Sequence, residues 1–214
     1  MKKSELIWFD LTQGLPTSFG TLYRELGTFG FVRLLLGFAV QSIISDPFKD
    51  LPKPKTPAEV FSYHQLKPAL VLDDVLKHRM KVPNERRIEI LRAVISEAGA
   101  KFIAFNVRIP SPQEWTNMNQ EQRDSFTQET MSRFLNAEAD AVSTPEDVFG
   151  FNVSHCHFAS LAHSLNREYL APLFCQADSL YFSQPQVLVQ LNRENTIAQG
   201  HQNCTFRFQF PEEK

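Results

Sequence analysis

The stretch Cys204-Thr-Phe-Arg-Phe-Gln-Phe210 alternates apolar and polar residues along its whole length. Successive side chains of a β-strand point to opposite faces, so this pattern predicts a strand that is buried on one face. The buried face would carry Cys204, Phe206, Phe208 and Phe210. The strand marks the C-terminal third as the β-containing part of the fold.

Two runs upstream of this strand alternate in the same way, at residues 148–153 and 187–191. We expect both to be strands of one small, mostly antiparallel sheet. Between them, residues 155–165 and 171–181 have the apolar spacing of short helices.

Helical patterns dominate the chain before residue 136. Residues 17–44 and 66–80 have helical spacing, Asn84 can cap a third helix, and Asn119 with Gln122 predicts the start of a fourth. The sequence therefore predicts an α+β fold, in which N-terminal helices precede a small sheet with helices packed on one side.

Four prolines between residues 47 and 57 predict an extended connection. We expect residues 1–57 to form an N-terminal helical arm with this Pro-rich connection. Residues 58–214 would form a single α+β domain, with a cysteine-bearing site within residues 136–210.

Composition narrows the classes of partner. The net charge is −2 and the basic residues form no dense stripe, which argues against nucleic acid. The apolar run at residues 29–44 is interrupted by Arg33 and Gln41, so we expect no membrane span. We expect a buried helix there, with a membrane-surface helix or a helix that joins a homo-oligomer as the alternatives. Three cysteines, without a secretory signal after Met1, predict reduced thiols in a cytoplasmic protein.

Cys156 is the first candidate for chemistry. With Ser154 as the N-cap, Cys156 would lie in the first turn of a helix and point away from its apolar face, where the helix dipole favours a thiolate. His157 beside it could be a base, a ligand or a substrate-binding group, and His155 could be a base or a ligand. Packing of a small buried thiol is the alternative for Cys156.

Cys175 and Asp178 are three residues apart, which places them side by side on a helix as nucleophile and base or as two metal ligands. Cys204 heads the apolar face of the last strand and could be a small buried hydrophobe. Arg193 could bind a substrate carboxylate, or could be a solvated charge at a strand end.

Three segments in this order resemble one known family. They are F-x-V-x-x-C (Phe151 to Cys156), L-F-C-x-x-D (Leu173 to Asp178) and R-x-x-T-I-A-x-G-x-x-x-C-x-F-R-F (Arg193 to Phe208). The pattern over residues 136–210 resembles the L-2-amino-thiazoline-4-carboxylic acid hydrolases. Its closing G-x-x-x-C-x-F-x-F is also similar to the 4-vinyl reductase domains.

The first resemblance implies hydrolytic opening of a 2-aminothiazoline ring to an N-carbamoyl-cysteine. On this reading Cys156 or a metal-activated water attacks the ring, Asp178 is the base and Arg193 holds the carboxylate. Cys175 and Cys204 would complete the pocket, or join Cys156 and Asp178 around a divalent metal such as zinc. His157 is a substrate-binding candidate from its position alone. The alternative is a non-enzymatic module, similar to the 4-vinyl reductase domains, that binds a small ligand or a metal; the 19 phenylalanines fit such an apolar cavity.

Overall fold

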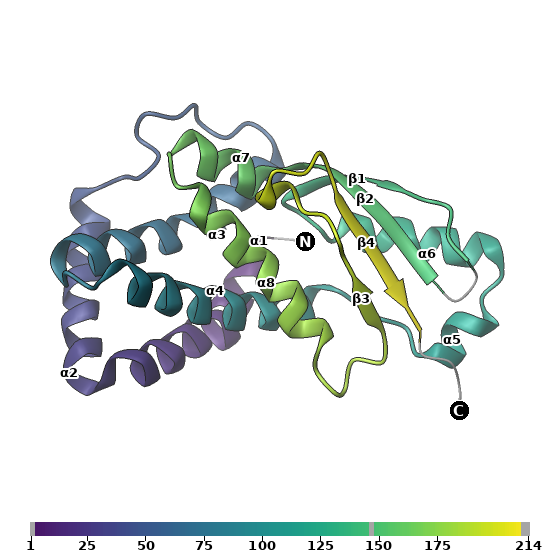
Figure 1. Cartoon of the computed structure of the whole chain (residues 1–214), viewed down its shortest axis with the longest axis horizontal. Helices are drawn as coiled ribbons and strands as arrows, with labels where there is room; N and C mark the ends of the chain where they lie inside the picture. Colours follow the sequence, from purple (N-terminus) through teal and green to yellow (C-terminus); the bar gives the residue numbers. More distant parts are fainter. Residues whose placement is uncertain (1–2, 146–147, 211–214) are drawn as a thin grey trace.

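The computed structural model describes residues 3–145 and 148–210. Its helical half and its sheet lie at opposite ends of the molecule, with α8 between them (Figure 1). The helices are α1 (Lys3–Phe9), α2 (Leu15–Ile44), α3 (Pro57–Asp74), α4 (Asn84–Asn106), α5 (Pro112–Asn117), α6 (Gln120–Ser132), α7 (His157–Ser164) and α8 (Ala171–Phe182). The strands are β1 (Ala137–Ala141), β2 (Val148–Cys156), β3 (Gln190–Asn192) and β4 (Cys204–Gln209). Short π-helical or 3₁₀ turns are η1 (Asp10–Gly14), η2 (Val75–Arg79), η3 (Glu168–Leu170) and η4 (Ile197–Gln199).

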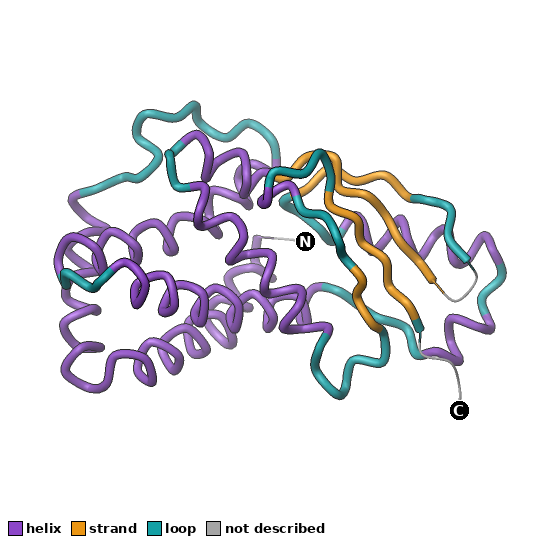
Figure 2. Tube along the Cα trace, viewed as in Figure 1, coloured by secondary structure: helices purple, strands orange, loops and turns teal. Residues whose placement is uncertain are grey.

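The sheet has the strand order β1-β2-β4-β3, and all of its pairs are antiparallel (Figure 2). Phe149 pairs with Phe208 and Phe151 with Phe206, so the phenyl rings stack across the strands with centroids 4.5 and 5.1 Å apart. Helices α6 and α8 pack on this phenylalanine face. The predicted α+β class, with helices on one side of the sheet, is confirmed.

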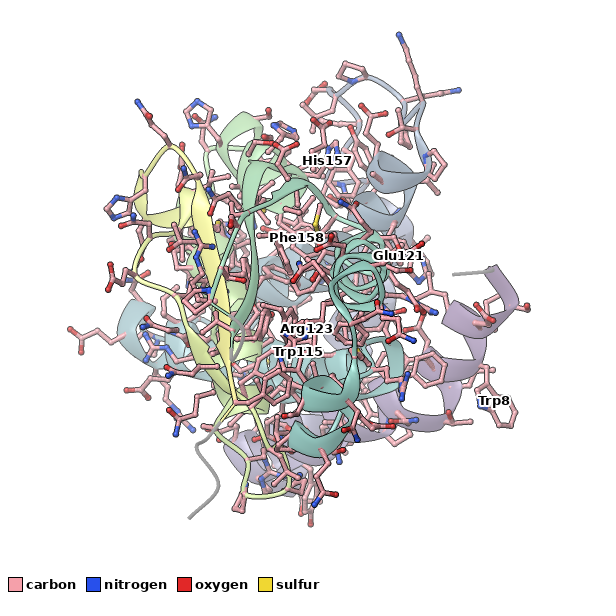
Figure 3. All side chains as sticks on the ribbon, turned by 90° about the vertical axis from the view of Figure 1, so that its right-hand side faces the viewer. Trp8, Trp115, Glu121, Arg123, His157 and Phe158 are labelled. Atoms are coloured by element: carbon pink, nitrogen blue, oxygen red, sulfur yellow. The ribbon has the colours of Figure 1, made fainter. Side chains whose placement is uncertain are left out.

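Trp115 of α5 closes the end of this core that lies far from α7. Its indole stacks on Phe210 with centroids 5.3 Å apart. The guanidinium of Arg123 lies 5.5 Å from the centroid of the indole. Figure 3 labels Arg123 and Trp115 next to each other. The phenylalanine face is thereby covered along the length of the strands.

The helical half is organised around α4, which packs against both α2 and α8. Gly27 divides α2 into two arms because its φ of 64° and ψ of 177° are outside the helical region. Gly99 lets α4 approach α8 closely, since a Cβ built there would lie 2.5 Å from the Cβ of Ala177. The position of α8, which carries two of the predicted site residues, therefore depends on α4.

A buried ionic cluster fixes α3 against α4 and η3. The carboxylate of Asp73 is fully buried and accepts hydrogen bonds from Arg87, from Arg167 at 2.7 Å and from the Tyr169 hydroxyl at 2.6 Å. Arg167 also contacts Asp74 at 2.5 Å. Because every charge has an opposite partner, we assign the cluster a structural role.

Several local predictions need correction. Asn84 is the first residue of α4, after Pro83 at the N-cap, and its Oδ1 accepts from Arg87 instead of a backbone N–H. The strand predicted at residues 187–191 is β3, shorter and displaced to Gln190–Asn192. β1 was not predicted, because its Ala-Glu-Ala-Asp-Ala sequence lacks large apolar residues. The capping box of Asn119 and Gln122 at the start of α6 is confirmed.

In the described part of the chain, the helical run Ser4–Ile44 is the one segment long and apolar enough to cross a membrane, and an 18-residue window within it has a mean hydropathy of 1.6. It includes the kink at Gly27, and Leu22 and Leu34 belong to the core that α3 and α4 build, but within α2 only Thr21, Leu22 and Leu34 are buried. The expectation of a buried helix at residues 29–44 is therefore wrong, because most apolar side chains of that segment, such as Phe29 and Ile43, are exposed. The expected lack of a membrane span stays a prediction, as does the division of the chain at residue 57. The last four residues of the predicted domain lie outside the described residues.

Candidate active site

A cavity of about 650 Å³ lies between the helical half and the sheet. Most of its wall is apolar, but it includes five of the six residues predicted for the site. They come from the end of β2, from α8, from the segment after β3 and from the start of β4: Cys156, Cys175, Asp178, Arg193 and Cys204. The fold thus joins residues up to 48 positions apart in one place, which we call the polar end of the cavity.

Arg193 and Asp178 form the charged pair of the polar end. Nη1 of Arg193 donates to Oδ2 of Asp178 at 2.5 Å, and Nη2 donates to the backbone carbonyl of Cys175 at 2.7 Å. The side chains are only 8% and 16% exposed. The guanidinium also lies 5.0 Å from the ring centroid of Phe206, so it is packed as well as hydrogen-bonded. This arrangement corrects the alternative of a solvated strand-end charge for Arg193.

Burial raises the pKa of the Asp178 carboxyl, and the guanidinium of Arg193 opposes this shift through its charge and its hydrogen bond. The guanidinium has five N–H donors, and its two hydrogen bonds to Asp178 and Cys175 use two of them. The remaining donors could bind a substrate carboxylate, whose negative charge would then share the guanidinium with Asp178 and weaken the attraction between Arg193 and Asp178.

Cys156 lies in a different local structure from the predicted one. Strand β2 continues through Cys156, which is the extended residue before α7, so Ser154 is not the N-cap. The reason is pairing with β1: Cys156 is opposite Ala137, and the N–H of His157 donates to the carbonyl of Asn136 at 2.9 Å. Its side chain packs on the sheet core and lines the cavity, so the prediction that it points away from the local core is wrong.

All three cysteines are free thiols, and burial raises the pKa of each. The pKa of Cys175 reaches about 12, although the charge of Arg193 acts in the opposite direction. For Cys156, the backbone N–H groups of Ala159 and Phe158 oppose the rise in pKa. Cys204 accepts from the N–H of Ile197 at 3.2 Å. Burial therefore favours protonated thiols at neutral pH, and Cys156 has the helix-start N–H groups that favour its thiolate.

The donor set does not fit a metal ion. Within residues 3–145 and 148–210, no three His, Cys, Asp or Glu side chains are arranged so that they could hold one. Asp178, the carboxylate proposed as a ligand, already faces the positive charge of Arg193. We derive no step through a metal.

His157 does not join the polar end. It is not among the residues that line the cavity, and its ring packs edge-on against His155 with centroids 4.7 Å apart. Burial lowers the pKa of His157, and the nearby His155 lowers it further through its charge. The next residue, Phe158, does line the cavity and packs against Phe174 of α8 with centroids 4.5 Å apart. Figure 3 labels His157 and Phe158, the first two residues of α7.

The phenylalanine content indicated an apolar cavity, but the residues that form its wall were not predicted from the sequence. It is supplied mainly by α2, α3 and α4, which contain Leu22, Leu34, Phe61, Leu72, Val94 and Phe102. Helical periodicity shows that such residues are buried, but it does not show whether they face another side chain or a cavity.

Comparison with known proteins identifies one family. The family model described as L-2-amino-thiazoline-4-carboxylic acid hydrolase matches residues 71–208, a range that contains all five residues of the polar end. No curated protein and no solved structure matches the chain. The similarity to the 4-vinyl reductase domains stays a prediction. Because the family match spans more than half of the sequence, the chain belongs to the L-2-amino-thiazoline-4-carboxylic acid hydrolase family.

Proposed function

We propose that this protein is a hydrolase that opens the ring of a small carboxylate-bearing heterocycle of the 2-aminothiazoline-4-carboxylate type. The observation that carries the proposal is the convergence of three thiols, a carboxylate and a guanidinium at one end of a cavity, in a chain of this family. These groups match the needs of the reaction: a nucleophile, a base and an anchor for the substrate carboxylate.

The reaction adds water across one bond. The ring carbon between nitrogen and sulfur receives the oxygen of water, its bond to sulfur breaks, and sulfur leaves as a thiol. One proton of water ends on the sulfur and the other on nitrogen, so the product is an N-carbamoyl-cysteine. In the route we favour, the sulfur of Cys156 attacks first and the ring opens to an enzyme-bound isothiourea. Water then releases the product and restores the thiol.

Asp178 is the proposed base. When the substrate carboxylate binds Arg193, it competes with Asp178 for the guanidinium and weakens the interaction that keeps the Asp178 pKa down. The carboxylate of Asp178 then accepts a proton more readily, either from the Cys156 thiol or from the attacking water. Substrate binding would in this way prepare the base.

Cys175 and Cys204 are proposed as wall residues. The pKa of Cys175, about 12, keeps its thiol protonated and able to donate a weak hydrogen bond to the substrate or to the departing sulfur. Cys204 is buried and already accepts a hydrogen bond from Ile197. Both serine variants should retain more activity than Cys156→Ser.

The test follows substrate loss and product appearance with purified protein, and the amount of product must exceed the amount of protein. Intact-mass spectrometry during turnover should detect the chain with one whole substrate mass added. The adduct should be missing in Cys156→Ser and present in Cys204→Ser. If the wild type turned over without any adduct and Cys156→Ser kept the full rate, water would attack directly and our choice of nucleophile would be wrong.

A non-enzymatic module that binds a small ligand is the second candidate function. The large apolar share of the cavity wall favours it, because binding of an apolar ligand needs no reactive thiol. Saturable binding of the aminothiazoline without any product, by folded protein, would support this candidate over the hydrolase.

Self-association through the exposed side of α2 and a cytoplasmic location remain proposals. Sedimentation of the purified protein at several concentrations would measure the first, and fractionation of cells would measure the second.

A further inference from the structure

The cavity is much larger than the proposed ring. A heterocycle of about nine non-hydrogen atoms would fill less than half of 650 Å³, even if each atom took the ~30 Å³ that a water molecule occupies in the liquid. The remaining space is apolar, and water gains few hydrogen bonds there. An occupant that uses the whole cavity must therefore be larger than the ring and mostly hydrocarbon.

Polarity is divided along the cavity. The charged pair and the thiols come from α8 and the sheet side, whereas α2, α3 and α4 supply leucine, valine and phenylalanine side chains. Some polar groups also line the helical half, namely Ser18, Ser42, His64, Gln65, Lys67 and Asn106. Of these, His64 contacts Asp10 at 2.8 Å, Lys67 contacts Asp46 at 3.4 Å, and Asn106 donates to the carbonyl of Arg133 at 2.7 Å. The chain thus has a reactive, carboxylate-binding end and an apolar end in one continuous space.

The apolar end is open to the outside beside α2. Leu15, Phe19 and Leu35 line the cavity and are also 45%, 43% and 38% exposed. A long ligand could enter, or extend its far end, between these side chains without displacing the buried core.

We propose that the site takes an amphiphile: a carboxylate-bearing head at the polar end, joined to a hydrocarbon tail that lies along α2, α3 and α4. This inference rests on the proposed function for the identity of the polar end, and it specifies the substrate class. After room for the head is set aside, the cavity accommodates a tail of roughly a dozen carbon atoms at ~30 Å³ each.

The test measures binding and needs no turnover. Straight-chain acids from butyrate to palmitate compete with a fluorescent fatty-acid probe for the purified full chain. We expect affinity to rise about fourfold per added methylene, the value that follows from ~0.8 kcal/mol per buried CH₂. The rise should level off at roughly a dozen carbons, when the tail reaches the open end beside α2 and further methylenes are no longer buried.

Variants at α2 test where the tail lies. Ser18→Phe fills the apolar end, because Ser18 lines the cavity on α2, a helix that carries none of the thiols. The matched control is Gly20→Phe on the same helix, where an added Cβ meets nothing within 4 Å. Ser18→Phe should lower the chain length at which affinity levels off and leave butyrate binding unchanged, whereas Gly20→Phe should behave as the wild type.

The outcomes separate this inference from the proposed function. Affinity that does not depend on chain length, or identical behaviour of the two α2 variants, would overturn the amphiphile even if the aminothiazoline ring is opened. Affinity that rises with chain length, and that levels off at a shorter chain in Ser18→Phe, would support the amphiphile even if no ring opens. The hydrolase proposal would then be the one that failed.

Discussion

Replacement of Arg193 by methionine tests the charged pair of the site. Methionine keeps much of the length and the apolar stem of the side chain but removes the guanidinium. The change abolishes the hydrogen bonds to Asp178 at 2.5 Å and to the carbonyl of Cys175 at 2.7 Å. It also leaves Asp178, only 16% exposed, without its counter-charge.

The expected loss of stability follows from this burial. Removing one partner of a buried ion pair costs about 3–5 kcal/mol, and Asp178 can limit the cost by taking up a proton. We therefore expect the free energy of unfolding of Arg193→Met to fall by about 3 kcal/mol at neutral pH. The double variant Arg193→Met, Asp178→Asn should recover part of this loss, because a neutral amide needs no counter-charge.

Activity should fall as well. A hydrogen bond to a charged group contributes about 1.5–3 kcal/mol, which corresponds to a loss of roughly 10- to 150-fold in kcat/KM for the carboxylate substrate. The neutral carboxamide analogue should be affected less, so the preference of the wild type for the acid should disappear in the variant.

The assay combines urea unfolding with initial rates on the acid and on the amide. Arg108→Met is the matched control, because Arg108 is exposed and pairs with Glu114 away from the cavity. It should leave both measurements unchanged. An Arg193→Met protein that keeps both its kcat/KM and its preference for the acid would refute the role of Arg193 as carboxylate anchor.

Three further predictions concern stability, each measured by urea unfolding. Gly99→Ala puts a Cβ 2.5 Å from a side chain of α8 and should lower the free energy of unfolding by about 1–3 kcal/mol. Gly20→Ala, on an open helical surface, should raise it by about 0.5–1 kcal/mol, and equal effects of the two variants would contradict the close approach of α4 and α8. Asp73→Ala leaves Arg87, 6% exposed, without its buried partner and should cost about 3–5 kcal/mol; a loss below about 1 kcal/mol would contradict the cluster's structural role. The pKa of Cys175 rises from 9.0 in the unfolded chain to about 12 in the folded chain, so its contribution to the free energy of unfolding is complete below pH 9.0 and is lost towards pH 12, at about 1.4 kcal/mol per pH unit. Cys175→Ala should make the free energy of unfolding fall less steeply over this pH range, and an unchanged slope would contradict the burial of this thiol.

The two long strands, β2 and β4, could be predicted from local pattern because each signal lies within a few residues. The alternation at Phe206 and Phe208 determines which face of β4 is buried, whereas its pairing with Phe149 and Phe151 is seen only in the structure. The capping box that begins at Asn119 is equally local. Such features depend on backbone geometry and on one buried face, which the sequence displays directly.

The environment of Cys156 could not be predicted in this way. Its extended backbone depends on pairing with β1, a strand of alternating alanines and acidic residues that carries no large apolar side chain. The ion pair of Asp178 with Arg193 joins a helix to a segment 15 residues further on, and no periodicity relates them. The cavity depends on how α2, α3 and α4 meet the sheet, which is a tertiary property.

The ring-opening reaction tests the central claim most directly. Wild-type protein and Cys156→Ser are incubated with 2-aminothiazoline-4-carboxylate, and the free thiol of the product is measured over many equivalents of protein. We predict multiple turnovers by the wild type and a rate at least about a hundredfold lower for Cys156→Ser. No turnover by the folded wild-type protein would contradict the proposed hydrolase.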